Sequence, residues 1–220
     1  MRGWVMVSAL VFAVFGSGVG PAAAGCVSGE GVRAPKEKVP FRDGEYRRAG
    51  PTLVCSFRPK PGEPEPDLDA MTAAICHHIG PLQIDMPIEQ ARERLGTTPV
   101  KVQPAGEGRA EIHLITGPDR QPIGYWVLYT DGRRLTAIQE TAAREGWQTP
   151  LPHAFSSIRP GDPVQRVLDV LGTPAQRCTG PGTVGELWNW GVHHISMEVA
   201  QGRVFSIKLD RIGPSRGKGI

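Results

Sequence analysis

The chain is poor in the residue types on which many familiar binding sites depend. Its 220 residues include 4 cysteines, 5 tryptophans, 3 tyrosines and 6 phenylalanines, and its net charge is only +3. A charge this small, scattered along the chain, excludes a polyanion-binding surface, so we expect no nucleic-acid partner. The 28 glycines and 21 prolines favour turns and short elements, which excludes a coiled coil or a helical bundle.

The sequence also lacks the spacings that catalytic and metal sites require. The histidines form two adjacent pairs, His77 with His78 and His193 with His194. Neighbouring residues point to opposite faces of a strand and about 100° apart on a helix, so neither pair is spaced to bind one ion. No Gly-x-Ser-x-Gly elbow or phosphate-binding loop occurs. We therefore predict no metal, no cofactor and no enzymatic activity.

The only long apolar run lies at the N-terminus, where Trp4 to Phe15 follows the positive charge of Arg2. The run is too short to cross a bilayer as a helix, which takes about 20 residues. With the small residues that end at Ala24, it has the three parts of a secretory signal peptide. We predict a signal peptide over residues 1–24 and an exported protein.

Cys26 leaves two ways of processing open. Residues 23–26 satisfy a permissive lipobox, in which Cys26 would carry a lipid, but the Ala-x-Ala of residues 22–24 fits ordinary cleavage better. Ordinary cleavage also leaves an even set of four cysteines in an oxidising compartment. Of the three connectivities that four cysteines allow, the pair closest in sequence is Cys55 with Cys76, which is our candidate disulfide.

Residues 25–66 are rich in proline and charge and predict a flexible extension. Thr52 to Phe57 is its only strand-like segment. After the extension, Asp67 to His78 has the apolar spacing of a short helix with Asp67 as its cap. A second short helix has Asp85 as its expected N-cap and Pro87 near its first turn, and it ends at Gly96.

An internal repeat follows. Residues 82–99 align with residues 158–174, so that Pro87 falls on Pro163 and the Leu-Gly-Thr at 95–97 falls on the Leu-Gly-Thr at 171–173. Strand-like runs separated by glycine turns come after each helix. In the first copy they are 110–116, 123–130 and 134–139, with a turn at Asp131-Gly132; in the second they are 185–190, 193–200 and 203–209, with a turn at Gln201-Gly202.

These patterns predict an α+β fold of two tandem repeats, each with short helices packed on one face of an antiparallel β-meander. The repeats cover residues 67–147 and 148–212, and a flexible tail covers 213–220. Each meander is expected to form a sheet of its own, giving a rigid pair of sheets. Alternation places three residues of the last strand in the core: Phe205, Ile207 and Leu209.

Four aromatic residues are candidates for partner binding. Tyr125 and Tyr129 share one face of their strand, opposite Trp126, and Trp188 and Trp190 share one face of theirs. Large rings usually fill cores, which is one interpretation. The other places a set of them on the uncovered sheet face as anchors for a protein partner, with polar neighbours such as Arg134, Glu198 and Lys208.

The second copy resembles the SmpA/OmlA (BamE-like) family of small outer-membrane assembly lipoproteins. The resemblance rests on residues 158–163, the helix that ends at Leu171-Gly172, the Trp188-x-Trp190 pair and the final hairpin at Gly202. The tandem arrangement is similar to that of the β-lactamase inhibitory proteins. The resemblance implies a non-catalytic protein-binding role in the periplasm or at the outer membrane. The alternative is an inhibitor-like module that binds a secreted or periplasmic enzyme.

Overall fold

A computed structural model describes residues 26–28, 45–49, 52–56, 78–143, 150–179, 185–191 and 194–211. The expected signal peptide, the C-terminal tail and most of the expected helix over 67–78 lie outside the described residues. Only His78 of that helix is described, and it begins a short strand instead.

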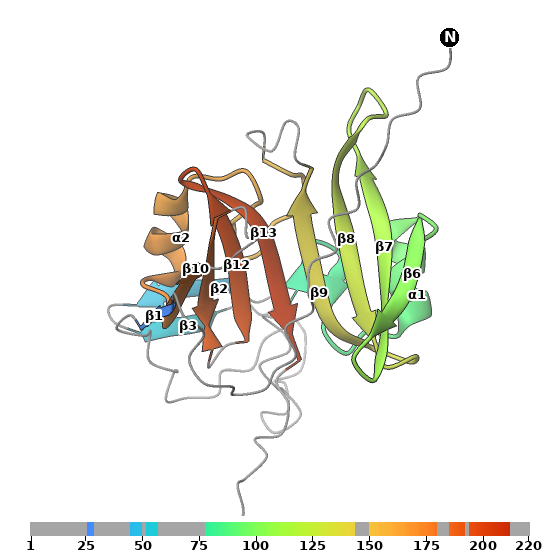
Figure 1. Ribbon diagram of the computed structural model, residues 1–220, viewed down its shortest axis with the longest axis horizontal. Helices are drawn as coiled ribbons and strands as arrows, with labels where there is room; N and C mark the ends of the chain where they lie inside the picture. The colour runs from blue at the N-terminus through green and yellow to red at the C-terminus, as the bar shows by residue number, and fades with distance from the viewer. Residues whose placement is uncertain are drawn as a thin grey trace, which may run out of the picture.

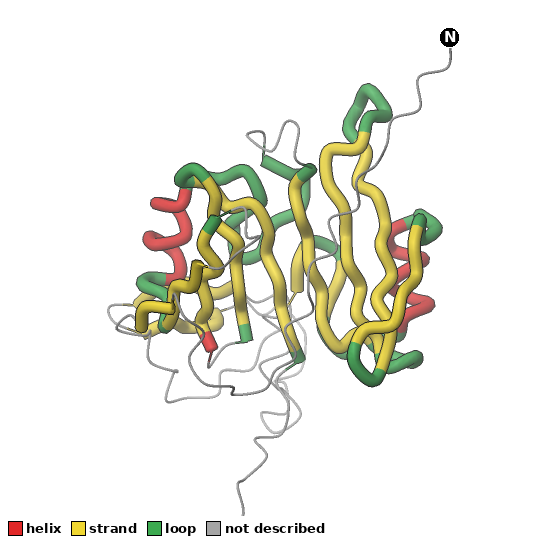
Figure 2. Tube along the Cα trace, viewed as in Figure 1, coloured by secondary structure: helices red, strands yellow, loops and turns green. Residues whose placement is uncertain are grey.

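The fold combines two helices with a large antiparallel sheet, as the α+β prediction required (Figures 1 and 2). Nine strands form one sheet in the order β1-β10-β11-β12-β13-β9-β8-β7-β6. Their bounds are β1 Cys26–Ser28, β6 Lys101–Ala105, β7 Gly108–Thr116, β8 Pro122–Thr130, β9 Leu135–Ala142, β10 Gln176–Thr179, β11 Glu186–Trp190, β12 Ile195–Ala200 and β13 Arg203–Asp210. Two small hairpins pair β2 (Glu45–Ala49) with β3 (Thr52–Ser56) and β4 (His78–Ile79) with β5 (Leu82–Gln83).

The expectation of two separate sheets is wrong. β6 to β9 form one meander and β10 to β13 form another, but β13 pairs with β9 along the middle of the nine-stranded sheet. We call this β9–β13 junction the seam. Paired residues on neighbouring strands point to the same side of a sheet. Each face of the first meander therefore continues across the seam into the corresponding face of the second.

Both helices pack on the same face of this sheet. The paired residues Leu128, Ile138, Leu209, Ile195 and Trp190 run across five strands and are all buried on that face. The apolar stripes of α1 (Ile88–Leu95) and α2 (Val164–Leu171) join the same core. In Figure 1, α1 lies behind β6 and β7, and α2 lies at the other end of the sheet.

The helix boundaries follow the proline and glycine signals. Pro87 and Pro163 occupy the N-cap positions, and Gly96 ends α1 with a left-handed φ of 61°. Asp85, expected to cap α1, instead lies two residues before the cap with a positive φ of 66°. Its carboxylate forms an ion pair with Arg211, with 2.6 Å between the Asp85 Oδ1 and Arg211 Nε atoms.

The same backbone contacts recur before the two helices. The N–H of Asp85 donates to the carbonyl of Leu135 at 3.0 Å, and the N–H of Gly161 donates to the carbonyl of Val204 at 2.7 Å. Asp85 and Gly161 hold matching positions in the aligned segments, two residues before the prolines, and both have positive φ. The chain therefore enters each helix along the same path.

A side-chain hydrogen bond repeats in the same place. Arg134 donates to the carbonyl of Asp85 at 2.7 Å, and Arg203 donates to the carbonyl of Gly161 at 2.9 Å. Each arginine follows the turn of its own meander. Arg134 was expected to border a partner-binding patch. Its guanidinium is instead hydrogen-bonded to the backbone just before α1.

The strands predicted for each copy are confirmed, and each meander has one strand more than predicted. β6 and β10 were missed because β6 contains Pro104 and both are short and polar. The extension over 25–66 was expected to be flexible apart from Thr52 to Phe57. Its residues Cys26–Ser28 instead form β1, an edge strand of the main sheet. Thr52 to Phe57 does contain a strand, β3, which pairs with β2.

Phe205, Ile207 and Leu209 are buried, as predicted. Val204, which strict alternation places on the opposite side, is also fully buried. The register between β12 and β13 shifts between Glu198 and Val199, so that Val199 pairs with Val204. An irregularity of this kind changes which side of the sheet the next residues face.

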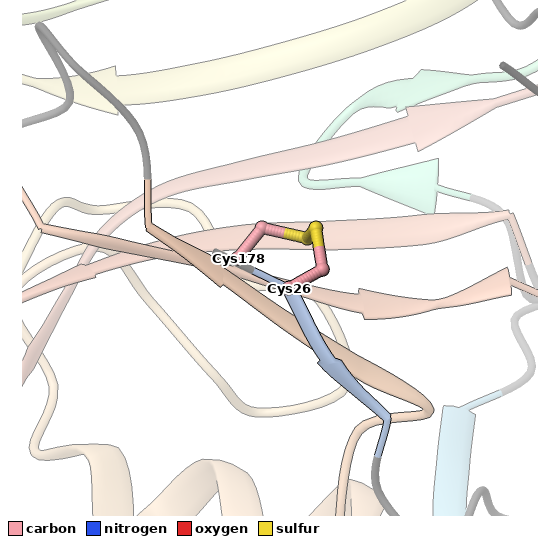
Figure 3. Close-up of a disulfide and its surroundings, with 2 residues drawn as sticks. All are labelled: Cys26 and Cys178. Atoms are coloured by element: carbon pink, nitrogen blue, oxygen red, sulfur yellow. A yellow bond between two sulfur atoms is a disulfide. The ribbon is translucent and has the colours of Figure 1, made fainter. Parts of the chain in front are cut away.

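A disulfide joins Cys26 on β1 to Cys178 on β10, directly across the pair of strands (Figure 3). This pair was not the one predicted; the side chain of Cys55 and all of Cys76 lie outside the described residues. A cysteine sulfur forms only one bond besides the bond to its own Cβ atom. In Cys26 that bond is the disulfide to Cys178, so Cys26 cannot also carry a thioether-linked lipid.

Removing this disulfide should destabilise the protein, because it closes a loop of 152 residues in the unfolded chain. We expect the Cys26→Ala/Cys178→Ala variant to lose about 2–5 kcal/mol of unfolding free energy, measured by urea denaturation. The reductant dithiothreitol should lower the stability of the wild-type protein more than that of the variant. Equal stability of the two proteins under oxidising conditions would contradict the pairing.

Candidate binding face

The sheet face opposite the helices carries the two tyrosines. Tyr125 and Tyr129 are half-buried there, while Trp126 between them is buried on the helix face, as the alternation predicted. One row of paired residues crosses this face over six strands: Leu114, Tyr125, Thr141, Ser206, Glu198 and Leu187. We call this row, together with the neighbouring Tyr129, Gln139 and Lys208, the tyrosine face. Thr141 and Ser206 at its centre are fully buried, and its other members are half-buried or exposed.

Trp188 and Trp190 do not belong to this face. Their exposed fractions are 4% and 1%, and both rings lie in the core that the helices cover. The indole N–H of Trp188 donates to Glu186 at 2.6 Å, and the guanidinium of Arg177 lies 4.1 Å from the centroid of the Trp188 ring. Their proposed role as surface anchors is therefore corrected: they fill the core.

A network of hydrogen bonds crosses the seam on the tyrosine face. The amide of Gln139 donates to Ser206 at 2.9 Å and to Thr141 at 3.3 Å, and the hydroxyls of Thr141 and Ser206 lie 3.0 Å apart. The hydroxyl of Tyr129 donates to the amide oxygen of Gln139 at 3.2 Å. Residues of both meanders thus share one set of polar contacts, which fixes the side chains at the centre of this face.

The charged residues of this face surround Tyr129. Lys208 forms an ion pair with Asp210, with 2.8 Å between Nζ and Oδ1, and its ammonium lies 5.0 Å from the centroid of the Tyr129 ring. Burial, followed by the charge of Asp210, raises the pKa of Tyr129 to about 12. Burial likewise raises the pKa of Tyr125, against a hydrogen bond with Thr141. Both phenols are therefore neutral hydrogen-bonding groups at neutral pH.

Glu198 is the partly buried carboxylate of the same row. Burial raises the pKa of its carboxyl, and a hydrogen bond with Ser206 opposes that shift. Its Oε2 atom has no hydrogen-bond partner among the described residues. The expectation that Glu198 and Lys208 face away from the core together with the tyrosines is confirmed by their register.

A second cluster of charge lies on the helix face, under α1. Arg92 donates to both carboxylate oxygens of Glu111, at 2.9 and 2.6 Å, and Arg109 lies 3.2 Å from the same carboxylate. Glu111 and His113 are fully buried, and His113 bonds to Thr97 at 3.2 Å. Sequence reasoning missed this cluster, although Glu111 and His113 alternate on a strand otherwise rich in apolar residues.

Burial opposes ionisation of Glu111, but its hydrogen bonds with Arg92 and its electrostatic interactions with Arg92, Arg109 and His113 together outweigh burial and lower its pKa. The hydrogen bond with Glu111 raises the pKa of Arg92 in turn. Burial lowers the pKa of His113 in spite of the neighbouring carboxylate. The pair Arg92–Glu111 is therefore ionised at neutral pH, and His113 is neutral beside it.

Glu140 is the other fully buried carboxylate of this face, in β9. His153, from the segment before α2, lies 3.1 Å from its Oε1 atom and 5.0 Å, centroid to centroid, from the ring of Trp126. Burial raises the pKa of Glu140 despite this histidine. The contact joins the linker between the meanders to the centre of the sheet.

Two further features bear on function. No group of three or more His, Cys, Asp or Glu side chains in the described part of the chain is arranged to hold a metal ion. No helix among the described residues is long and apolar enough to cross a membrane.

Comparison with protein-family models, curated proteins and solved structures finds no match to this chain.

Replacing Arg92 with leucine should leave Glu111 buried with only Arg109 to compensate its charge. We expect a loss of about 3 kcal/mol of unfolding free energy at pH 7, measured by urea denaturation. Arg94→Leu, on the exposed side of the same helix, should change it by less than about 1 kcal/mol.

The effect of Arg92→Leu should depend on pH. A carboxyl whose folded pKa is lowered stabilises the fold above its unfolded value, near 4.5, and this contribution is lost as the pH falls through the folded pKa. The difference between wild type and Arg92→Leu should therefore shrink below about pH 4.5. A constant difference from pH 7 to pH 3 would show that Arg92 acts only by packing.

Proposed function

We propose that this protein is an exported, non-catalytic component of a bacterial cell envelope that binds another protein through its tyrosine face. The observation that carries the proposal is that the row of paired residues on this face continues across both meanders, on the side of the sheet away from α1 and α2. Its half-buried centre combines two tyrosines with the amide of Gln139 and the ammonium of Lys208, and the buried hydroxyls of Ser206 and Thr141 hold that amide in place. Tyrosine surrounded by polar groups is typical of protein interfaces.

We further propose that the two halves, residues 67–147 and 148–212, are tandem copies of one BamE-like unit. The recurring contacts of Asp85 and Gly161, and of Arg134 and Arg203, support this relation. So does the bridge between Phe155 and Ile158, which repeats the pairing of Ile79 with Leu82 at the aligned positions.

The location follows from the expected signal peptide. Ordinary cleavage after Ala24 releases the chain into an oxidising compartment, where Cys26 and Cys178 form their disulfide. We propose that the protein is periplasmic and meets the outer membrane through its partner, because a disulfide at Cys26 leaves that sulfur unavailable for a lipid.

The alternative partner is a secreted or periplasmic enzyme, inhibited by an inserted loop. The tandem arrangement and the two-residue turn at Gln201-Gly202 are compatible with it, but the fixed polar groups lie on the sheet and not in a loop. We therefore favour a partner that covers the sheet face, such as an outer-membrane assembly component.

Capture from a solubilised envelope fraction tests the proposal. The wild-type protein should retain β-barrel assembly components, and Tyr125→Ala/Tyr129→Ala should weaken that binding by about 30-fold or more, as for a hot spot of about 2 kcal/mol. Trp188→Ala should instead unfold the protein, because its ring is buried.

Glu93→Ala, exposed on α1, is the matched control and should bind like the wild type. Thermal melting must show that the tyrosine variant is folded. Retention of a single hydrolase would favour the inhibitor alternative. Equal binding by the wild-type protein and the folded tyrosine variant would contradict the assignment of the face.

A further inference from the structure

The side of the sheet that carries the tyrosine face changes in polarity from one meander to the other. Over β7 and β8 it is apolar: Leu114 is 38% exposed, Ile112 and Tyr125 are half-buried, and Val127 is buried but lies outside the core that the helices cover. Register pairs Ile112 with Val127 and Leu114 with Tyr125. We call these four residues the apolar end. Beyond β8 the same side is mostly polar, with Gln139, Lys208, Asp210, Ser196, Glu198 and Asn189.

A cation borders the apolar end on its outer flank. Lys101 lies on β6, the last strand of the sheet, where it is paired with Ile112 and exposed. No carboxylate in the described part of the chain forms an ion pair with Lys101. Lys208, on the polar part of the same side, is instead 2.8 Å from Asp210. The apolar end therefore lies next to a positive charge that is open to a partner.

The dimensions of the apolar end match one α-helix. Neighbouring strands are about 4.8 Å apart, so β7 and β8 present a strip about 10 Å wide, and a helix with its side chains is about 10–12 Å across. The opposite face of the first meander already packs against a helix, α1 (Figure 1). A second sheet would also cover the polar part of the face and remove its side chains from water. A helix is therefore the element that covers the apolar end alone.

The charges on this side define one flank of such a helix. A carboxylate on the flank above β6 would be attracted by Lys101, and an ammonium there would be repelled. The other flank would lie above Tyr129 and Gln139, which are hydrogen-bonded to each other and uncharged. An acidic flank beside an apolar stripe is therefore the pattern that complements this surface.

We propose that the apolar end receives an amphipathic helix of the protein partner, with its apolar stripe on Ile112, Leu114 and Tyr125 and an acidic residue of its flank beside Lys101. The proposal rests on the protein-binding function above and names the partner's contacting element. Burial of the apolar stripe supplies the affinity. The ion pair is exposed and contributes little affinity, but it fixes the orientation of the helix.

A synthetic helical peptide about three turns long, with a leucine stripe and glutamates along one flank, tests the site. In carbon-13 NMR titrations of the full exported chain, it should shift the methyls of Ile112 and Leu114. The methyls of Val102, which is exposed on the helix side of β6, should not shift. The matched peptide with lysines in place of the glutamates should bind about threefold more weakly or less tightly still. Equal binding of the two peptides, or no shift at millimolar peptide, would overturn the proposal.

Three substitutions at exposed positions locate the site. Leu114→Ser should weaken binding of the glutamate peptide about tenfold, because it removes apolar area from the contact. Lys101→Glu should reverse the preference, so that the lysine peptide binds more tightly. Val102→Ser is the control and should bind like the wild type. Unchanged binding by folded Leu114→Ser, or a Lys101→Glu variant that still prefers the glutamate peptide, would exclude this site.

Vesicles of phosphatidylglycerol distinguish a helix from a lipid surface, which also combines apolar with anionic groups. The vesicles should leave the Leu114 methyls unshifted. Shifts of these methyls with vesicles and with neither peptide would overturn the proposal in favour of a membrane-facing surface.

Failure here is distinguishable from failure of the proposed function. Partner capture that Tyr125→Ala/Tyr129→Ala abolishes but Leu114→Ser and Lys101→Glu leave intact would reject the helix site and retain the tyrosine face. A peptide preference that Lys101→Glu reverses, without capture of any envelope protein, would retain the helix site and reject the function.

Discussion

The pairing of β13 with β9 is the constraint on which the rest of the structure depends. Five residue pairs, from Ser206–Thr141 to Asp210–Ala137, join the two meanders, and Arg211 extends the contact by donating its N–H to the carbonyl of Thr136 at 2.7 Å. The side chain of Arg211 then forms ion pairs with Asp85 and Asp131 in the loops of the first half. Without this junction, each meander would have its own edges and the tyrosine face would end at β9.

The two meanders make the same backbone contacts at the start of their helices but bury different side chains. Register places Glu111 opposite Leu128 and His113 opposite Trp126 in the first meander, and Trp188 opposite Met197 and Trp190 opposite Ile195 in the second. One half therefore buries a paired charge cluster where the other buries two tryptophans. The backbone contacts that recur at the prolines and turns do not involve these core side chains, so they are compatible with either set.

The sequence predicted those parts of the fold that depend on local signals. Proline and glycine positions located α1 and α2, glycine turns located the hairpins, and alternation separated Tyr125 and Tyr129 from Trp126. The pairing of β9 with β13 and the disulfide of Cys26 with Cys178 could not be predicted, because both join segments far apart in the chain. Which aromatic pair was buried was also undecided, since alternation gives the two faces of a strand but not the face that a helix covers.

Native-state hydrogen exchange at the seam tests the central claim most directly. Arg211 and Thr136 are bonded across the seam, so the alternating amides of Ile138, Glu140, Ile207 and Leu209 also point across it. If the two meanders form one sheet, these amides will exchange as slowly as the amide of Leu128 within the first meander, through opening of the whole sheet. Exchange at the seam 100-fold faster or more than at Leu128 would show instead two meanders that part from each other, and would contradict a continuous binding face.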